Sequence, residues 1–552
     1  MRRLVLVLLL LCSMSWLSMQ GLKAAGARAW PTLERQLAAD RVAPGSALET
    51  LIAANQDFSL LRPEEANDKI PVPLWLRVVW RRAHPQEVYS GADPTGGYPH
   101  VLREVHEWMV FHQDLVPPPR EGSHGAPRLA SAGANSRISG AQTTPRSESA
   151  IAINFLNPSA IISASNSISA SGRQAEFYSA DGGATWGQTS LPLQTSLKDA
   201  FHSDPTVDWT SDGKAWSMTI GINNAGSKLH MRSYQSANGG ATWTFDNTFS
   251  GTQTSTDKPM LWVDHSASSL FRDNIYVIWH NGNPAYVNHR TSAGWGSPLK
   301  VSGAESTGTA IGGDVKTNSA GDVFAFWPTT GNSRIVVAKS VNGGASFGTP
   351  VVAATTFDSY DIGIPSMDSR RALIYVSGGA YKSGSIDNVY ATWIDQTGVA
   401  GCNSPANEPG SNVASSCKTR VWFARSTNGG STWSTPVMIN NQSSKNDQFN
   451  QWLAVDETSG KIGVMYYDTV GNSGRLKTDV WYQSSADNGV TWSAAIKVTT
   501  AMTDETVAGA DLGNQYGDYN GMSGFLAKFF PSWTDRRSNA KEEVWTAPIS
   551  DP

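Results

Sequence analysis

The chain has 552 residues, of which 40% are hydrophobic and 16% charged, with a formal net charge of −4. This length and apolar content exclude a disordered protein, and the balance of 43 basic against 47 acidic residues excludes the strongly basic surface that nucleic acid requires. With 51 Gly and 21 Trp, the composition favours many short strands joined by tight turns over long salt-bridged helices.

The N-terminus predicts a secretory signal over residues 1–27. Arg2 and Arg3 precede an apolar run at residues 4–17, and Ala25-Gly26-Ala27 fits a cleavage site of small residues. The run is short for a membrane span, and an uncleaved anchor is the alternative. We therefore expect a secreted or periplasmic monomer with no membrane span after signal removal.

Residues 28–115 are expected to form a small helical N-terminal region, because Val105, Trp108 and Met109 recur at helical spacing. Residues 116–145 are rich in Pro, Gly, Ser and Ala without periodicity, which predicts a flexible linker. The histidines of the N-terminal region lack metal-ligand spacing with carboxylates, so we expect no metal and no cofactor.

From residue 146 onward an eight-residue element recurs, each time after a short β-run. Its Asp or Asn can bond backbone N–H groups, its Gly can adopt positive φ, and its Thr or Ser and aromatic residue can close a β-hairpin. The five copies begin at Ser179, Ser236, Ser340, Ser426 and Ser485, and each carries Asp or Asn at its third position: Asp181, Asn238, Asn342, Asn428 and Asp487.

Two further strand patterns recur with the hairpins in units of about 50 to 60 residues, the period of a four-stranded propeller blade. One is an apolar strand that opens with polar residues, and the other is an aromatic β-strand such as Ile275–Trp279. Counting the opening strands predicts seven blades, with six as the alternative. A strand near residues 143–149 is expected to close the ring.

Ser-x-Asp-x-Gly-x-Thr-Trp is the Asp-box, and residues 146–552 resemble the sialidase-like Asp-box (BNR-repeat) β-propellers. The resemblance implies a mainly β fold in which the Asp-boxes are structural turns on the face opposite the ligand site. It is specific for the fold and not for the activity, since such propellers include sialidases, other glycosidases, polysaccharide lyases and non-enzymatic receptors.

In such a blade the ligand face holds the start of each innermost strand and the loops between second and third strands. Polar residues that open the inner strands should therefore meet at a central mouth: Glu148, Asp204, Lys258, Asp314, Lys316, Asp361, Gln448, Asn450, Asp518 and Tyr519. We predict catalytic roles for Asp204, Asp361, Asp518 and Tyr519. Substrate-binding roles are predicted for His202, Lys258, Gln448, Asn450 and Tyr516.

Cys402 and Cys417 are the two cysteines outside the signal, and they lie 15 positions apart in a Gly/Ser/Asn-rich segment. In an exported chain they predict a disulfide that staples a surface loop. This loop falls between the second and third strands of the fifth blade, hence on the mouth face.

Sialidases of the family that this chain resembles bind the substrate carboxylate with three arginines, one of them in an Arg-Ile-Pro motif. This chain has no such motif, and its most similar segment, Gly363-Ile-Pro365, lacks the arginine. Arg146, Arg370 and Arg371 are the nearest candidates, but their positions do not match the pattern. The absent clamp argues against sialic acid as the substrate.

The leading hypothesis is that the protein recognises an extracellular glycan. On one interpretation it also cleaves that glycan. Paired carboxylates would serve a hydrolase acting on a neutral sugar, whereas Tyr519 or His202 as base, with Lys258 or Lys316 neutralising a uronate, would serve a polysaccharide lyase. The alternative is a non-catalytic propeller that binds a polysaccharide or a protein. Each opening carboxylate also has a purely structural interpretation, as an acceptor for backbone N–H groups around the channel.

Overall fold

The computed structural model describes residues 130–552, except residues 283, 303–309, 331, 398–399, 403–406 and 539–540. The predicted signal, the helical N-terminal region and residues 116–129 of the linker lie outside the described residues. Within the described part, no helix is long and apolar enough to cross a membrane. The helical elements found there are two 3-10 turns, η3 (Thr195–Leu197) and η4 (Pro365–Met367).

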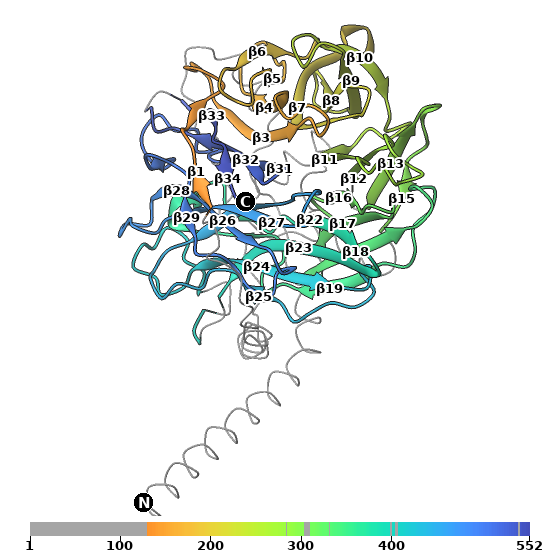
Figure 1. The fold of residues 1–552 in the computed structure, drawn as a ribbon. Helices are drawn as coiled ribbons and strands as arrows, with labels where there is room; N and C mark the ends of the chain where they lie inside the picture. Colours follow the sequence, from red (N-terminus) through yellow and green to blue (C-terminus); the bar gives the residue numbers. More distant parts are fainter. Residues whose placement is uncertain are drawn as a thin grey trace, which may run out of the picture.

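Seven antiparallel sheets surround a central axis as the blades of a propeller (Figure 1). Each blade begins with its innermost strand, and neighbouring innermost strands contact one another in cyclic order until the seventh meets the first. This confirms seven blades over the alternative of six. The innermost strands are β3 (Arg146–Ile153), β7 (Asp199–Trp209), β11 (Thr256–Val263), β16 (Asp314–Thr317), β22 (Ser377–Ser383), β26 (Gln448–Val455) and β31 (Gly521–Phe525).

The remaining strands follow each inner strand outward through the blade. Blades 1 to 3 contain β4 (Ile161–Ser167), β5 (Ala175–Ser179), β6 (Gly187–Ser190); β8 (Ala215–Asn223), β9 (Leu229–Ser236), β10 (Thr244–Thr248); β12 (Ile275–Asn281), β13 (Ala285–Thr291), β14 (Gly294–Trp295) and β15 (Leu299–Lys300). Blades 4 and 5 contain β17 (Val323–Thr329), β18 (Arg334–Ser340), β19 (Val351–Thr355); β23 (Ile386–Gln396), β24 (Thr419–Ser426) and β25 (Val437–Met438). Blades 6 and 7 contain β27 (Ile462–Asp468), β28 (Lys477–Ser485), β29 (Ile496–Lys497), β30 (Thr503–Asp504); β32 (Lys528–Asp535), β33 (Glu543–Thr546) and β34 (Ile549–Ser550).

The ring is closed by residues that the sequence assigned to the linker. β1 (Ser131–Ala132) pairs with β34, and β2 (Ser136–Arg137) pairs with β33, so the two ends of the described chain share the seventh blade (Figure 1). The propeller therefore begins before residue 146. The segment expected to close the ring, near residues 143–149, instead overlaps the innermost strand of blade 1.

The opening of the fifth blade was also misplaced. Asp361 lies in β20 (Asp361–Ile362), which pairs with β21 (Ala372–Leu373) in a two-stranded insertion between blades 4 and 5. The true inner strand, β22, begins at Ser377 with small residues, so its sequence lacks the apolar run seen in inner strands such as β3 and β11. A polar residue followed by an apolar one gives the same sequence pattern in this insertion as at the opening of an inner strand.

The eight-residue repeats form the predicted turns between third and fourth strands. In the first copy, Ser179 Oγ donates to Asp181 (2.8 Å) and accepts from the Gly183 amide (2.9 Å), while the Thr185 amide donates to Asp181 (2.9 Å). The other four copies make the same three bonds. Because the chain reverses at each strand, these turns lie on the face opposite the starts of the inner strands.

Candidate functional site

Four inner strands carry a β-bulge, close to the first residues of β3, β11 and β26 and near the middle of β7. The pairing register shifts in β3, β7, β11 and β26, and one residue in each bulge has positive φ: Glu148 (54°), Asp204 (58°), Lys258 (53°) and Asn450 (45°). Non-glycine residues pay for this backbone conformation, and bulges redirect side chains out of the regular pleat. The same irregularity thus gives four polar side chains a common special orientation around one axis.

Three of these side chains meet others in a buried cluster, here called the mouth network, made of Glu148, Asn166, Asp204, Lys258, Arg370 and Asp518. Lys258 Nζ and Arg370 Nη2 both donate to the Asp518 carboxylate, one to each oxygen. Glu148 Oε1 lies 3.8 Å from Arg370 Nη2 and accepts the Asp518 amide at 3.3 Å. Glu148, Lys258 and Asp518 are only 3%, 4% and 2% exposed.

Asn166, on the second strand of blade 1, joins the first two inner strands. Its Nδ2 donates to Glu148 Oε2, and its Oδ1 accepts the Asp204 amide at 2.8 Å. One amide side chain therefore fixes the positions of two bulged residues. Asp204 itself accepts a hydrogen bond from the Ser203 hydroxyl.

The two carboxyl groups at the centre of the network are held in opposite protonation states. Burial, together with the charges of Asp518 and Asp204, raises the pKa of Glu148 to about 8, against the smaller opposing effects of Lys258 and Arg370. Burial also acts to raise the pKa of Asp518, but Arg370 and Lys258 outweigh it and hold that pKa below its usual value. At neutral pH the mouth therefore holds a neutral carboxylic acid beside an ionised carboxylate.

Tyr519 lies beneath these carboxyls and is neutral at ordinary pH. Its hydroxyl donates to the Pro205 carbonyl at 3.3 Å, and its ring is 5.6 Å from that of Tyr375. Burial and the charges of Asp204 and Glu148 raise the pKa of Tyr519 well above 10. Because the hydroxyl faces a carbonyl and not a base, the arrangement lacks the activation that a tyrosine nucleophile needs.

Asp361 and His202, which were predicted to lie at the mouth, have their contacts elsewhere. Asp361 accepts from Arg371 Nε at 2.9 Å, and Arg371 in turn makes two further bonds to Glu408, at 3.0 and 2.8 Å. His202 Nε2 lies 3.2 Å from the Tyr234 hydroxyl, and burial, with Arg232 nearby, lowers the pKa of His202 to about 3. This side-chain contact of Asp361 thus lies within the insertion, and that of His202 lies within blade 2.

The predicted binding residues other than Lys258 and His202 also hold the fold together. Gln448 donates to Asp468 at 3.0 Å, and Asn450 Nδ2 donates to the Gly517 carbonyl at 2.8 Å. Tyr516 is buried between the rings of Phe449 and Tyr467, at 5.1 and 4.7 Å. Asn450 therefore anchors the segment that carries Asp518, and the other two pack around blade 6.

Three members of the mouth network received no catalytic or binding role from the sequence. Glu148 is an opening residue for which the sequence predicts no role, the position of Arg370 does not match the arginine pattern of the sialidases, and no motif in the sequence marks Asn166. One sequence feature could have drawn attention to Arg370. It stands next to Arg371 in a long segment between the strands of blades 4 and 5. Among the described residues, no group of three or more His, Cys, Asp and Glu side chains is arranged to hold a metal ion.

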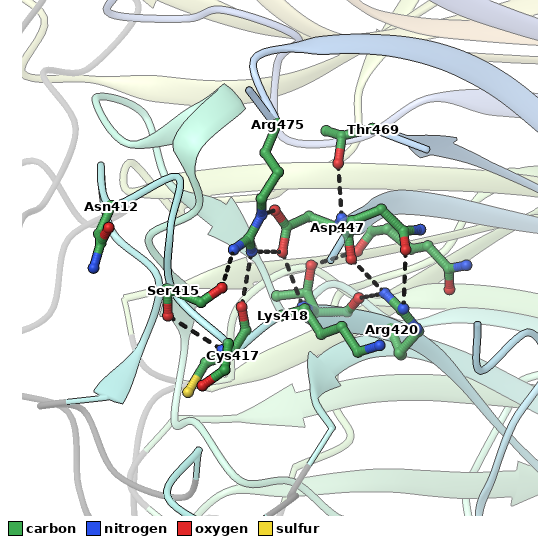
Figure 2. Close-up of polar contacts among 12 residues, drawn as sticks. Asn412, Ser415, Cys417, Lys418, Arg420, Asp447, Thr469 and Arg475 are labelled. Atoms are coloured by element: carbon green, nitrogen blue, oxygen red, sulfur yellow. Dashed lines mark hydrogen bonds and ion pairs between the residues drawn. The ribbon is translucent and has the colours of Figure 1, made fainter. Parts of the chain in front are cut away.

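The predicted disulfide between Cys402 and Cys417 is present, with Cα atoms 5.1 Å apart. Figure 2 shows how its loop is fixed to blade 6: Arg475 donates to the Ser415 and Cys417 carbonyls at 2.8 Å each and to both oxygens of Asp447. Nearby, burial and the charge of Arg420 lower the pKa of Lys418 to about 8. Glu408, which binds Arg371, belongs to the same stapled loop.

Taken together, the fold and the site define a seven-bladed propeller whose mouth is filled by a buried charged network. Structures similar to it include a leech intramolecular trans-sialidase (11% identity, 65% of this chain and 71% of that chain, TM-score 0.41) and the NanB sialidase of Streptococcus pneumoniae (11%, 66% and 70%, TM-score 0.39). The Aleuria aurantia lectin is also similar (11%, 67% and 98%, TM-score 0.35). No protein-family model and no curated protein matches the sequence. The strand order of the chain itself, and not these distant likenesses, establishes the propeller.

Proposed function

We propose that this protein is an exported propeller that recognises an extracellular glycan at the mouth and hydrolyses a glycosidic bond there. One arrangement carries the proposal: Glu148 and Asp518 lie in one buried cluster, where burial raises the pKa of Glu148 while Arg370 and Lys258, bonded to Asp518, hold the pKa of Asp518 low. Glycoside hydrolysis needs a protonated carboxyl group to release the leaving oxygen and a carboxylate to act as base or nucleophile. We assign the acid to Glu148 and the carboxylate to Asp518.

Lys258 and Arg370 support this assignment, because they keep Asp518 ionised inside a buried site. Arg370 is engaged with Asp518 and is not part of a three-arginine clamp, which favours a sugar without a carboxylate over sialic acid. The signal expected at residues 1–27 and the disulfide support export to an oxidising compartment, which fractionation of the producing cells would test.

The test is release of reducing sugar and of unsaturated uronate from a polysaccharide panel that includes a sialoside. Wild type is compared with Glu148→Gln, Asp518→Asn and the control Asp212→Asn, an exposed carboxylate on the turn between β7 and β8, on the opposite face. We expect each mouth variant to lose activity by about 10²- to 10⁴-fold, with the control unchanged. Equal activity in all four proteins would refute the assignment, and new ultraviolet absorbance would identify a lyase.

A non-catalytic propeller that binds a polysaccharide is the second candidate. The observation that favours it is the saturation of Asp518, whose two oxygens are both occupied by cations in a cluster that is almost completely buried. Binding of glycans without any product, unchanged in Glu148→Gln, would establish this function and exclude the hydrolase.

A further inference from the structure

A cavity of about 890 Å³, including its part open to solvent, occupies the central channel on the other side of Tyr519 from the mouth network. All seven inner strands or the residues beside them line it, from Ser149 and Tyr519 at the inner end to Phe155, His265 and Glu457 at the outer end. The outer residues follow the last residues of β3, β11 and β26, so the cavity leads toward the face of the repeat turns.

The walls of this channel are mainly apolar and aromatic. Trp262, Trp452, Phe155 and Phe525 line it together with Ile, Leu, Val and Met side chains. Lys316 also reaches the wall, but its Nζ is paired with Asp314 at 2.7 Å and lies 4.6 Å above the Trp262 ring. The body of a ligand that fills the channel would therefore be apolar or aromatic.

Most polar groups of the wall already have partners. Asp208 accepts from the Trp209 and Val263 amides at 2.8 Å each, and Trp262 Nε1 donates to Thr317 at 2.9 Å. A sugar would find few free partners for its hydroxyl groups here. Ser149 Oγ is different: it is fully buried at the inner end and has no hydrogen-bond partner among the described residues.

The outer end carries a net negative charge. His265 is bonded through Nε2 to Asp208 (3.1 Å) and through Nδ1 to Glu457 (2.7 Å), and its ring stacks on Phe155 at 4.4 Å. Although burial opposes it, these two carboxylates raise the pKa of His265 well above its ordinary value, so one cation faces two anions. The Glu457 side chain is 27% exposed and can meet a ligand.

We propose that the channel is a second binding site, separate from the mouth, for a small amphipathic amine. Its apolar or aromatic body lies between the inner strands, its ammonium group is held by Glu457 at the outer end, and a polar substituent on the body can bond to Ser149. The site does not depend on the proposed hydrolase, because Tyr519 lies between the two and the ligand chemistry differs.

The test uses three pairs of probes with the same body and opposite charge: tryptamine and indole-3-acetate, phenethylamine and phenylacetate, and octylamine and octanoate. Binding of each to the full-length secreted protein is measured by calorimetry at neutral pH. We expect saturable one-to-one binding of at least one amine, about tenfold or more tighter than its carboxylate partner. Failure of all three amines to bind, or equal affinity within every pair, overturns the proposal.

Three variants locate the site. Glu457→Gln, at a partly exposed position that should fold, is expected to remove the preference for the amine, while Asp212→Asn, an exposed carboxylate on the same face, leaves it unchanged. Asp518→Asn is expected to keep amine binding even if it abolishes glycan cleavage, so failure at the mouth and failure in the channel are distinguishable. Loss of the preference in Asp212→Asn, or its survival in Glu457→Gln, would place the charge effect elsewhere and overturn the assignment.

Discussion

Replacing Asp518 by Asn should change the protonation of Glu148. The substitution removes the anion that both Lys258 and Arg370 contact, and loss of one partner from a buried ion pair usually costs about 3–5 kcal/mol. Glu148 is close enough to respond, because its Oε1 lies 3.8 Å from Arg370 Nη2. Its pKa of about 8 is raised by burial and then by Asp518, so the variant both removes a repulsion and leaves two cations uncompensated.

The expected magnitudes follow from this exchange of charge. When Glu148 ionises in the variant, the protein recovers about 1.4 kcal/mol of folding stability at pH 7 for each unit by which the pKa of Glu148 falls below 7. We expect Asp518→Asn to cost about 2–3 kcal/mol at pH 7, and Glu148→Gln, which replaces an already neutral group, less than about 1 kcal/mol. In the double variant, Glu148 can no longer supply a negative charge in place of Asp518. The double variant should therefore cost about 4–5 kcal/mol, which exceeds the sum of the two single variants by about 1–2 kcal/mol.

The assay is urea unfolding of the four proteins at pH 7, followed by tryptophan fluorescence. Glu148→Gln combined with Asp212→Asn is the control pair and should be additive within about 0.5 kcal/mol, because distant sites do not couple. Additive free energies for Glu148→Gln and Asp518→Asn would refute the reasoning, since they would mean that Glu148 does not take over the charge of Asp518.

Three further predictions concern stability. Burial, opposed by hydrogen bonds from Gln174 and Ser217, raises the pKa of Glu176 to about 8, so the folded state keeps a proton that the unfolded state loses between pH 4.5 and 8. Glu176 therefore destabilises the fold increasingly as pH rises through this range, and Glu176→Gln should reduce the fall in stability by up to about 1.4 kcal/mol per pH unit, measured by urea unfolding at pH 5 and 8. Opening the Cys402–Cys417 disulfide by the double Ser variant should cost about 3 kcal/mol for a closed loop of this length, and dithiothreitol should destabilise wild type but not the variant. Arg475→Lys keeps the charge but loses the paired bonds to Asp447 and should cost about 2–3 kcal/mol, whereas Lys477→Arg, at a largely exposed position nearby, should leave the melting curve unchanged.

The fold could be predicted where its signals are local in the chain. The turn that begins at Ser179 is complete within eight residues, and its bonds join Ser179, Asp181 and Thr185 without help from elsewhere. Five such turns fix the spacing of the blades, and alternation of strands then places the mouth on the opposite face. By contrast, the pairing of Ser136 with Thr546 joins residues from opposite ends of the propeller, and a two-residue strand leaves no pattern to detect.

The mouth was predicted in outline but not in its chemistry. Strand order predicts that Asp204, Lys258 and Asp518 lie on one face, and the structure brings these three residues into the mouth network, although Asp518 precedes the inner strand β31. Arg370 could not be placed in the same way, since its contact with Asp518 depends on how an insertion between two blades folds over the mouth. Asp361 shows the reverse error, because a polar residue before an apolar one looks the same in an insertion as at a strand opening.

The bulges explain why residue types alone could not identify the acid and the base. Glu148, Asp204, Lys258 and Asn450 comprise two acids, a base and an amide, yet each has positive φ within the bulge of its inner strand. The repeated feature is therefore the backbone conformation, and the blade supplies a fixed direction into which different side chains are placed. What each side chain then does depends on its burial and on its neighbours across the axis. Burial, with Asp518 and Asp204 nearby, raises the pKa of Glu148, whereas Asp518 keeps Lys258 charged although it is buried. Strain retained at four strands of one ring is more readily explained by a shared site than by four separate structural needs.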